Sequence, residues 1–208
     1  MSGAAVFVDK DGTLVTNVPY NVDPARLRFE PQALAALRDL SRAGFSIVVV
    51  SNQSGLARGL FTWPQLLRLR EALERRLINE GGVVLRGFYV CPHAPDAQGQ
   101  PTCDCRKPAP TLLRRAAQRL DLDLARSWMV GDTLDDVEAG RRAGCRAILY
   151  DSGGETVWRD GPERRPHARH TRWSEVARTI LADARRGRPP TGQTRAATQE
   201  GPAWQRVG

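Results

Sequence analysis

Short apolar runs alternate along the chain with longer segments in which apolar residues recur at every third or fourth position. Phe45 to Val50 is a continuous apolar run rich in β-branched residues, which is typical of a strand covered on both faces. Leucines recur at helical spacing after Thr62, whose distance to Gln65 resembles a capping box. The predicted strands are residues 4–8, 45–50, 87–90, 128–130 and 147–150, and the predicted helices are residues 30–44, 62–79, 109–120, 134–143 and 174–184.

This order of elements predicts an α/β fold, with an open parallel (Rossmann-like) sheet and helices on both faces. We expect residues 1–184 to form one domain, because a chain of 208 residues is short for two substantial cores. Residues 185–208 are rich in Arg, Pro, Gly, Thr and Gln and almost lack aliphatic side chains. This composition predicts a disordered basic tail.

Small polar or acidic residues follow three of the predicted strands. Asp9 and Asp11 come after the first, Ser51 after the second, and Asp132 after the fourth. The first of these segments alone fits an ordinary Asp-Gly turn about equally well. However, the carboxyl ends of parallel strands meet in one crevice, so all three segments predict a shared site.

The residue types at this predicted site suit a divalent cation and a phosphoryl group. Asp9 and Asp132 offer the oxygen ligands that magnesium prefers. Ser51 can donate a hydrogen bond to a phosphoryl oxygen, and Lys107 can neutralise charge that develops on that group.

A second group of ligands lies in the segment that precedes Lys107. Cys91 and His93 stand at one end of a polar loop, and Cys103 and Cys105 stand at the other. Zinc prefers these ligand types, and four protein ligands predict a structural ion with no open position. The alternative is a set of buried thiols with an incidental histidine, but a metal clip explains how a loop without a core is held in place.

With these motifs, the chain resembles the haloacid dehalogenase superfamily of phosphatases. The resemblance covers residues 4 to about 150 and includes Asp9-x-Asp11-Gly12-Thr13, Ser51-Asn52, Lys107 and Gly131-Asp132 in order, the last followed by Asp135-Asp136. It implies that Asp9 attacks phosphorus, and that Asp11 protonates the leaving oxygen and then activates water. It also implies that Asp9, the Asp11 carbonyl and Asp132 hold Mg²⁺, while Ser51 and Lys107 contact the phosphoryl group.

The cysteine loop narrows the resemblance to the subgroup of D-glycero-D-manno-heptose 1,7-bisphosphate 7-phosphatases and histidinol-phosphate phosphatases. The segments Ser51 to Gly59 and Phe88 to His93 carry this resemblance. It implies a small phosphorylated metabolite as substrate, with the heptose bisphosphate as the first expectation and histidinol phosphate or another sugar phosphate as the alternative. The implied substrate-binding residues are Asn52, Gln53, Ser54, Arg106 and Thr133.

Three positions depart from the pattern of this subgroup. Lys10 replaces the usual Arg, Pro110-Thr111 replaces Pro-Gly, and Thr133 stands where the heptose enzymes tend to carry Lys. The change at Thr133 removes a cation that would face a phosphate or sugar. The spacing between the motifs leaves no room for a separate cap domain, so we expect an open site with residues 16–23 as a flap.

The charge and composition decide between the remaining classes. A net charge of +8 favours a nucleic-acid 3′-end phosphatase or binding protein, but the tail supplies five arginines against Glu200 and hence +4 of this charge. Aromatic residues make up only 6% of the chain, so no nucleic-acid partner is expected. No apolar stretch of about 18 residues and no signal-like N-terminus occurs, which predicts a cytoplasmic protein without a membrane partner. We also expect a monomer.

Overall fold

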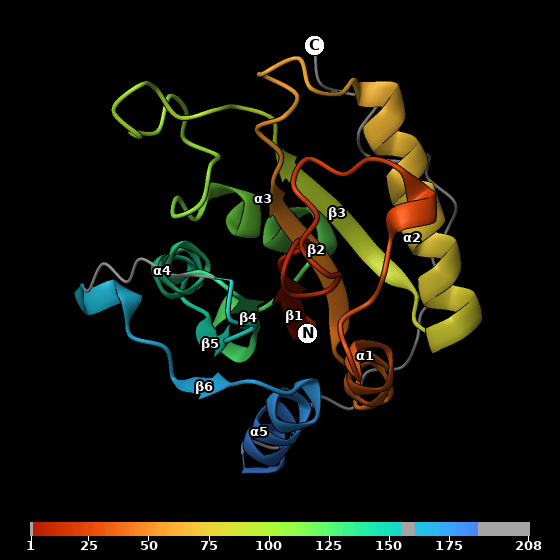
Figure 1. Ribbon diagram of the computed structural model, residues 1–208. Coiled ribbons are helices and arrows are strands. Elements are labelled where there is room, and N and C mark those ends of the chain that lie inside the picture. Colours follow the sequence, from red (N-terminus) through yellow and green to blue (C-terminus); the bar gives the residue numbers. More distant parts are fainter. Residues whose placement is uncertain (1, 155–160, 187–208) are drawn as a thin grey trace.

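The computed structural model describes residues 2–154 and 161–186, which fold around one parallel six-stranded sheet (Figure 1). The strand order across the sheet is β3-β2-β1-β4-β5-β6. Successive strands are added outward in one direction from β1 to β3 and in the opposite direction from β4 to β6. The segments that follow the adjacent strands β1 and β4 therefore enter the same crevice. The strands are β1 (Ala5–Val8), β2 (Ser46–Asn52), β3 (Leu85–Cys91), β4 (Trp128–Gly131), β5 (Arg146–Tyr150) and β6 (Ala168–His170).

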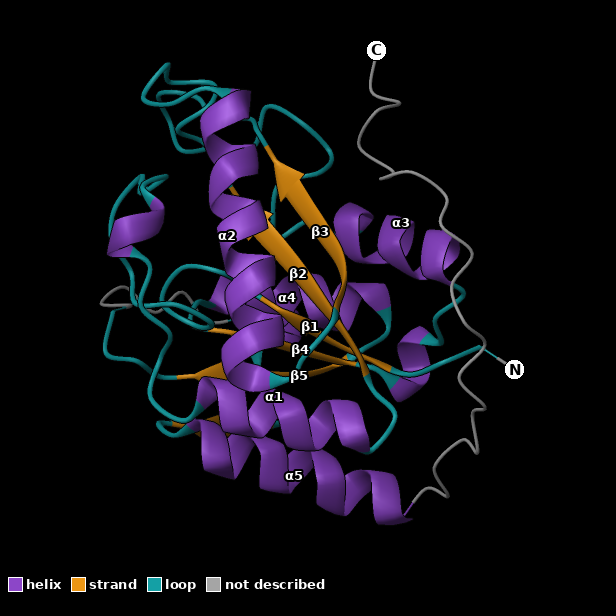
Figure 2. Cartoon of the chain, turned by 90° about the vertical axis from the view of Figure 1, so that its right-hand side faces the viewer, coloured by secondary structure: helices purple, strands orange, loops and turns teal. Residues whose placement is uncertain are grey.

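Helices cover both faces of the sheet (Figure 2). The helices α1 (Ala33–Arg42), α2 (Trp63–Gly81) and α5 (Trp173–Arg186) pack on one face, and α3 (Thr111–Leu120) and α4 (Leu134–Ala143) pack on the other. Short 3₁₀ helices occupy Pro24–Arg26, Leu124–Arg126 and Pro162–Arg164. No second domain occurs within the described ranges, in agreement with the expected lack of a cap. No helix in these ranges is long and apolar enough to cross a bilayer.

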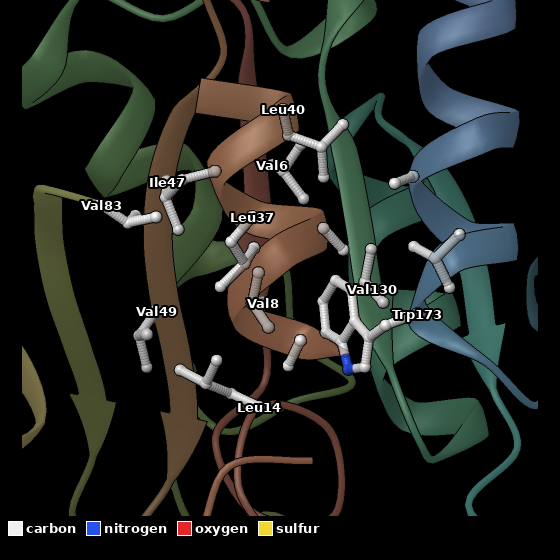
Figure 3. Close-up of a cluster of buried hydrophobic side chains, with 14 of the residues drawn as sticks. Val6, Val8, Leu14, Leu37, Leu40, Ile47, Val49, Val83, Val130 and Trp173 are labelled. Atoms are coloured by element: carbon white, nitrogen blue, oxygen red, sulfur yellow. The ribbon is translucent and has the colours of Figure 1, made fainter. Parts of the chain in front are cut away.

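The two-residue period of the strands divides the core into two layers. Val6 and Val8 of β1 pack with α1 and α5 (Figure 3). Ala5 and Phe7 pack with α3 and α4 on the opposite face. All four side chains are fully buried. A continuous apolar strand is therefore required at the centre of the sheet, because neither face of β1 meets solvent.

Trp173 links the last helix to the segment that follows β1. Its indole is fully buried beside Val8 and Val130 (Figure 3), and its Nε1 donates a hydrogen bond to the carbonyl oxygen of Thr13 at 2.8 Å. A buried indole N–H needs such a partner, so the contact fixes both the aromatic ring and the loop. The C-terminal helix thus supports the backbone just beyond Asp9 and Asp11.

The predicted elements agree with the structure to within a few residues at each end. The predicted capping box forms in part, since the Oε1 atom of Gln65 accepts a hydrogen bond from the Thr62 backbone nitrogen at 2.8 Å. The strand β6 was not predicted, because it is three residues long and none of its side chains is fully buried. The predicted domain boundary at residue 184 falls within α5, and residues 187–208 of the predicted tail lie outside the described residues.

Candidate phosphatase site

The carboxyl ends of β1, β2 and β4 bring the predicted site residues together. The backbone nitrogen of Asp9 donates to the carbonyl of Val130 at 2.9 Å, so the parallel ladder extends to the first aspartate. Asp9, Ser51 and Asp132 are all buried at this edge, with exposed fractions of 8%, 1% and 6%. Three segments that are far apart in the sequence therefore supply one polar centre, as the strand pattern predicted.

Lys107 carries the positive charge in this centre. Its Nζ atom lies 2.5 Å from Oδ1 of Asp9 and 2.5 Å from Oδ1 of Asp136, and it donates to the carbonyl of Val50 at 2.9 Å. The side chain is only 3% exposed. Although burial lowers the pKa of Lys107, the carboxylates of Asp136 and Asp9 outweigh this effect and raise it. The ammonium is therefore charged and held by three oxygen atoms.

Negative charge exceeds positive charge at this point. Asp9, Asp132 and Asp136 each place an oxygen within 4.8 Å of the others. Burial raises the pKa of Asp9 to about 7, against the opposing effect of Lys107, and burial with the charge of Asp136 raises the pKa of Asp132 to about 8. A divalent cation among these oxygens would relieve the repulsion, so the donor set fits Mg²⁺.

Asp136 was absent from the predicted site residues. It is 1% exposed and belongs to the first turn of α4, where its Oδ2 atom accepts from the Thr133 hydroxyl at 2.7 Å. The same carboxylate reaches Lys107 through Oδ1. The pair Asp135-Asp136 after Gly131-Asp132 was the available signal, but a helix-capping role alone explains an acidic residue at this position.

Two glycines allow these carboxylates to approach the backbone. A Cβ atom on Gly131 would lie 2.2 Å from the Cβ of Asp136. Gly12 has a φ of +79°, and a Cβ there would lie 2.2 Å from Oδ2 of Asp132. Asp132 is further held by the Thr13 hydroxyl, which donates to its Oδ1 at 3.1 Å. The sharp turn after β1 thus depends on glycine both for its conformation and for space.

Asp11 lies beside the carboxylate cluster but not within it. Its side chain is 29% exposed, and its Oδ1 atom accepts from Nζ of Lys10 at 2.5 Å. Its Oδ2 atom accepts from Nε2 of Gln53 at 3.0 Å. The role of Asp11 as a magnesium ligand through its backbone carbonyl stays a prediction, and the carboxylate oxygens that lie nearest one another are those of Asp9, Asp132 and Asp136. The more exposed position suits a group that exchanges protons with substrate or water.

The residues predicted to bind substrate differ in their surroundings. The amides of Asn52 and Gln53 contact Lys107 and Asp11, and the Thr133 hydroxyl caps α4. Ser54 is half-buried in the loop after β2. Arg106 is also half-buried and donates to the His93 carbonyl at 3.4 Å. Their roles toward a substrate stay predictions.

The four predicted zinc ligands gather beside the site. The sulfur of Cys91 lies 3.5 Å from that of Cys103 and 3.2 Å from that of Cys105, and Nδ1 of His93 lies 3.3 Å from the Cys105 sulfur. Ligands of a tetrahedral zinc at about 2.3 Å would be separated by roughly 3.8 Å, so the cluster has nearly the size required. All three thiols are free of disulfides. The donor set therefore fits a structural zinc ion.

The parallel sheet, with paired aspartates after its central strand and a lysine reaching them from a later loop, defines a phosphatase of the haloacid dehalogenase class. The HAD-hydrolase-like family model matches residues 104–172. A D-glycero-β-D-manno-heptose-1,7-bisphosphate 7-phosphatase from Yersinia pestis is 39% identical over 160 residues, which span 76% of this chain and 85% of the relative. The Escherichia coli K12 protein of the same name is 38% identical over 167 residues, or 79% of this chain and 83% of the relative.

The solved structures agree with this result. A crystal structure of D,D-heptose 1,7-bisphosphate phosphatase from B. bronchiseptica, complexed with magnesium and phosphate, superposes with a TM-score of 0.72. It is 31% identical, and the match covers 87% of this chain and 99% of that one. The chain therefore belongs to the haloacid dehalogenase-like phosphatases, in the subgroup of these heptose bisphosphate enzymes.

The close approach at Gly131 generates a testable prediction. We expect Gly131→Ala to lower the free energy of unfolding by about 2 kcal/mol, because overpacking of a fixed core typically costs 1–3 kcal/mol. Chemical denaturation followed by circular dichroism measures the change. Gly3→Ala is the control, since its new Cβ would lie 3.9 Å from the nearest side-chain atom. Equal stability of the two variants would contradict the proposed constraint.

Proposed function

We propose that this protein is a magnesium-dependent phosphatase that removes the 7-phosphate of D-glycero-β-D-manno-heptose 1,7-bisphosphate. The observation that carries the proposal is the buried contact of Lys107 with Asp9 and Asp136 beside Asp132. This arrangement supplies a nucleophile, a cation and a set of metal ligands at one point. The relatives bearing the name of this activity support the choice of substrate.

In the proposed reaction, an oxygen of Asp9 attacks phosphorus and the bond to the sugar oxygen breaks. Asp11 donates a proton to that oxygen, which leaves as an alcohol. Asp11 then takes a proton from water, and the resulting hydroxide attacks the aspartyl-phosphate to release inorganic phosphate and regenerate Asp9. Asp9, Asp132 and the Asp11 carbonyl would hold Mg²⁺, which would neutralise charge on the phosphoryl oxygens.

The other residues of the centre hold the phosphoryl group. Lys107 offers a fixed positive charge, which stabilises negative charge as it develops. Ser51 accepts from Nε2 of Gln53 at 2.8 Å, so its hydroxyl hydrogen is available for a phosphoryl oxygen. Zinc at the cysteine loop would act structurally, by fixing the segment that carries Arg106 and Lys107.

The distribution of surface charge favours a small substrate over a nucleic acid. Several arginines of the described residues are paired with carboxylates, which reduces the local positive potential. These pairs are Arg70–Glu74, Arg76–Glu80, Arg142–Glu138 and Arg146–Asp183. The lack of a nucleic-acid partner, the monomeric state and the cytoplasmic location stay predictions.

The first test of this proposal is turnover. We expect magnesium-dependent release of phosphate from the heptose bisphosphate, complete loss with a chelator, and recovery when Mg²⁺ is restored. Asp9→Asn should abolish turnover, and Asp11→Asn should reduce it by about a hundredfold to ten-thousandfold, the usual contribution of acid–base catalysis. Asp39→Asn, an exposed change on α1, is the control. Full activity in Asp9→Asn would contradict the aspartyl-phosphate mechanism, and faster turnover of histidinol phosphate would reassign the substrate.

The second test concerns zinc. Elemental analysis of protein purified without added metal should find close to one zinc per chain. Cys103→Ser should lower both the zinc content and the thermal stability, and it should raise KM by loosening the loop before Lys107. Cys145→Ser is the matched control for zinc content, because Cys145 is a buried thiol that is not among the four candidate ligands. A zinc-free protein with reduced thiols and full activity would contradict a structural metal.

The third test concerns the second phosphate of the substrate. Because Thr133 carries no charge and caps α4, we expect kcat/KM for the bisphosphate to exceed that for the 7-monophosphate by less than about a thousandfold, or 4 kcal/mol. Thr133→Lys should increase the ratio, whereas Thr133→Ser, which keeps the capping hydroxyl, should leave it unchanged. A larger ratio in the unmodified protein would mean that another cation reads the second phosphate.

A further inference from the structure

Two neighbouring amide side chains at the end of β2 turn toward predicted catalytic groups. Asn52 is the last residue of the strand, and Gln53 follows it. Successive residues of an extended chain point in opposite directions, so the two amides can reach different partners. Gln53 is only 5% exposed. A buried amide must have its hydrogen-bonding groups satisfied, and these partners therefore show what the side chains do.

Asn52 pairs with the main chain of Lys107 through both ends of its amide. Its Nδ2 atom donates to the Lys107 carbonyl at 3.2 Å, and its Oδ1 atom accepts from the Lys107 backbone nitrogen at 3.1 Å. Two such bonds fix the position and the orientation of one peptide segment. Lys107 lies in a connection between β3 and α3 that has no regular hydrogen-bonded element of its own. Asn52 therefore ties this connection to the sheet.

Gln53 holds the side chain of Asp11. Its Nε2 atom donates to Oδ2 of Asp11 at 3.0 Å and to Oγ of Ser51 at 2.8 Å. An amide nitrogen has two hydrogens, so both are used. Since Lys10 binds the other oxygen of Asp11, the carboxylate is fixed from two sides. Neither Nε2 hydrogen is left to contact a substrate.

We propose that Asn52 and Gln53 are positioning residues, with Asn52 setting the main chain at Lys107 and Gln53 orienting the carboxylate of Asp11. This inference rests on the proposed phosphatase function and deepens it. It differs from the direct substrate contact that the sequence resemblance implied for both residues. Misplacing a reacting or charge-stabilising group by about 1 Å can cost a hundredfold in rate, so losing either amide acts on the chemical step.

The experiment measures kcat and KM for Asn52→Ala and Gln53→Ala, with the natural substrate or any phosphomonoester that the unmodified protein hydrolyses. We expect kcat to fall by about tenfold to a hundredfold, while KM changes by less than about threefold. Asn79→Ala and Gln118→Ala, which remove exposed amides from α2 and α3, are matched controls and should behave like the unmodified protein. Thermal unfolding establishes that each variant is folded.

Double variants test whether each amide acts through its proposed partner. If Asn52 works only through Lys107, then Asn52→Ala should cost almost nothing further in a Lys107→Ala background. Likewise, Gln53→Ala should cost almost nothing further in an Asp11→Asn background. Asn52→Asp keeps the acceptor for the Lys107 backbone nitrogen and loses the donor. Its kcat should therefore lie between that of Asn52→Ala and that of the unmodified protein. This variant also serves if Asn52→Ala does not fold.

The outcomes separate this inference from the function on which it rests. A tenfold rise in KM with kcat retained, or effects that add fully to those of Lys107→Ala and Asp11→Asn, would make the amides substrate ligands and overturn the inference. Unchanged kinetics in both single variants would also overturn it. A protein that hydrolyses no phosphomonoester in the presence of Mg²⁺ would instead refute the proposed phosphatase function.

Discussion

The site depends on one buried contact, in which the Lys107 ammonium lies between Asp9 and Asp136. Removing the lysine would leave crowded carboxylates without a compensating charge, and an unpaired buried charge typically costs 3–5 kcal/mol. The contact also joins three separate parts of the fold, since its members come from the segment after β1, the connection after β3 and the first turn of α4. The position of one cation therefore governs the geometry of the whole centre.

Holding that cation in place accounts for much of the surrounding structure. The connection from Pro92 to Pro110 contains no helix or strand, and a long polar loop cannot fix a side chain by core packing. The cysteine cluster brings Cys91 and His93 close to Cys103 and Cys105, just before Arg106, and Asn52 holds the loop at Lys107 itself. The two restraints act on opposite sides of Arg106, which leaves this arginine beside the site on a fixed backbone.

The fold followed from the sequence because each central strand is a continuous apolar run, and the meeting of Asp9, Ser51 and Asp132 followed from the topology. Asp136 and the roles of the two amides did not. A periodic pattern places a residue on a helix or strand. It does not predict the direction of a side chain at the end of a strand or in the first turn of a helix. Such directions depend on neighbours from distant segments, as the contact of Asn52 with Lys107 illustrates.

The buried centre of the site and the more exposed residues around it affect substrate choice differently. Asp9, Lys107 and Asp136 are enclosed and mutually constrained, so a change at any of them is expected to disturb the proposed reaction itself. The expected margin is Arg106 together with the predicted flap of residues 16–23, where Tyr20 is 48% exposed and has a φ of 54°. Because the described residues contain no cap domain to enclose a substrate, we expect the selective contacts to come from such loop residues. Selectivity can therefore change at the margin while the phosphoryl-transfer centre stays intact.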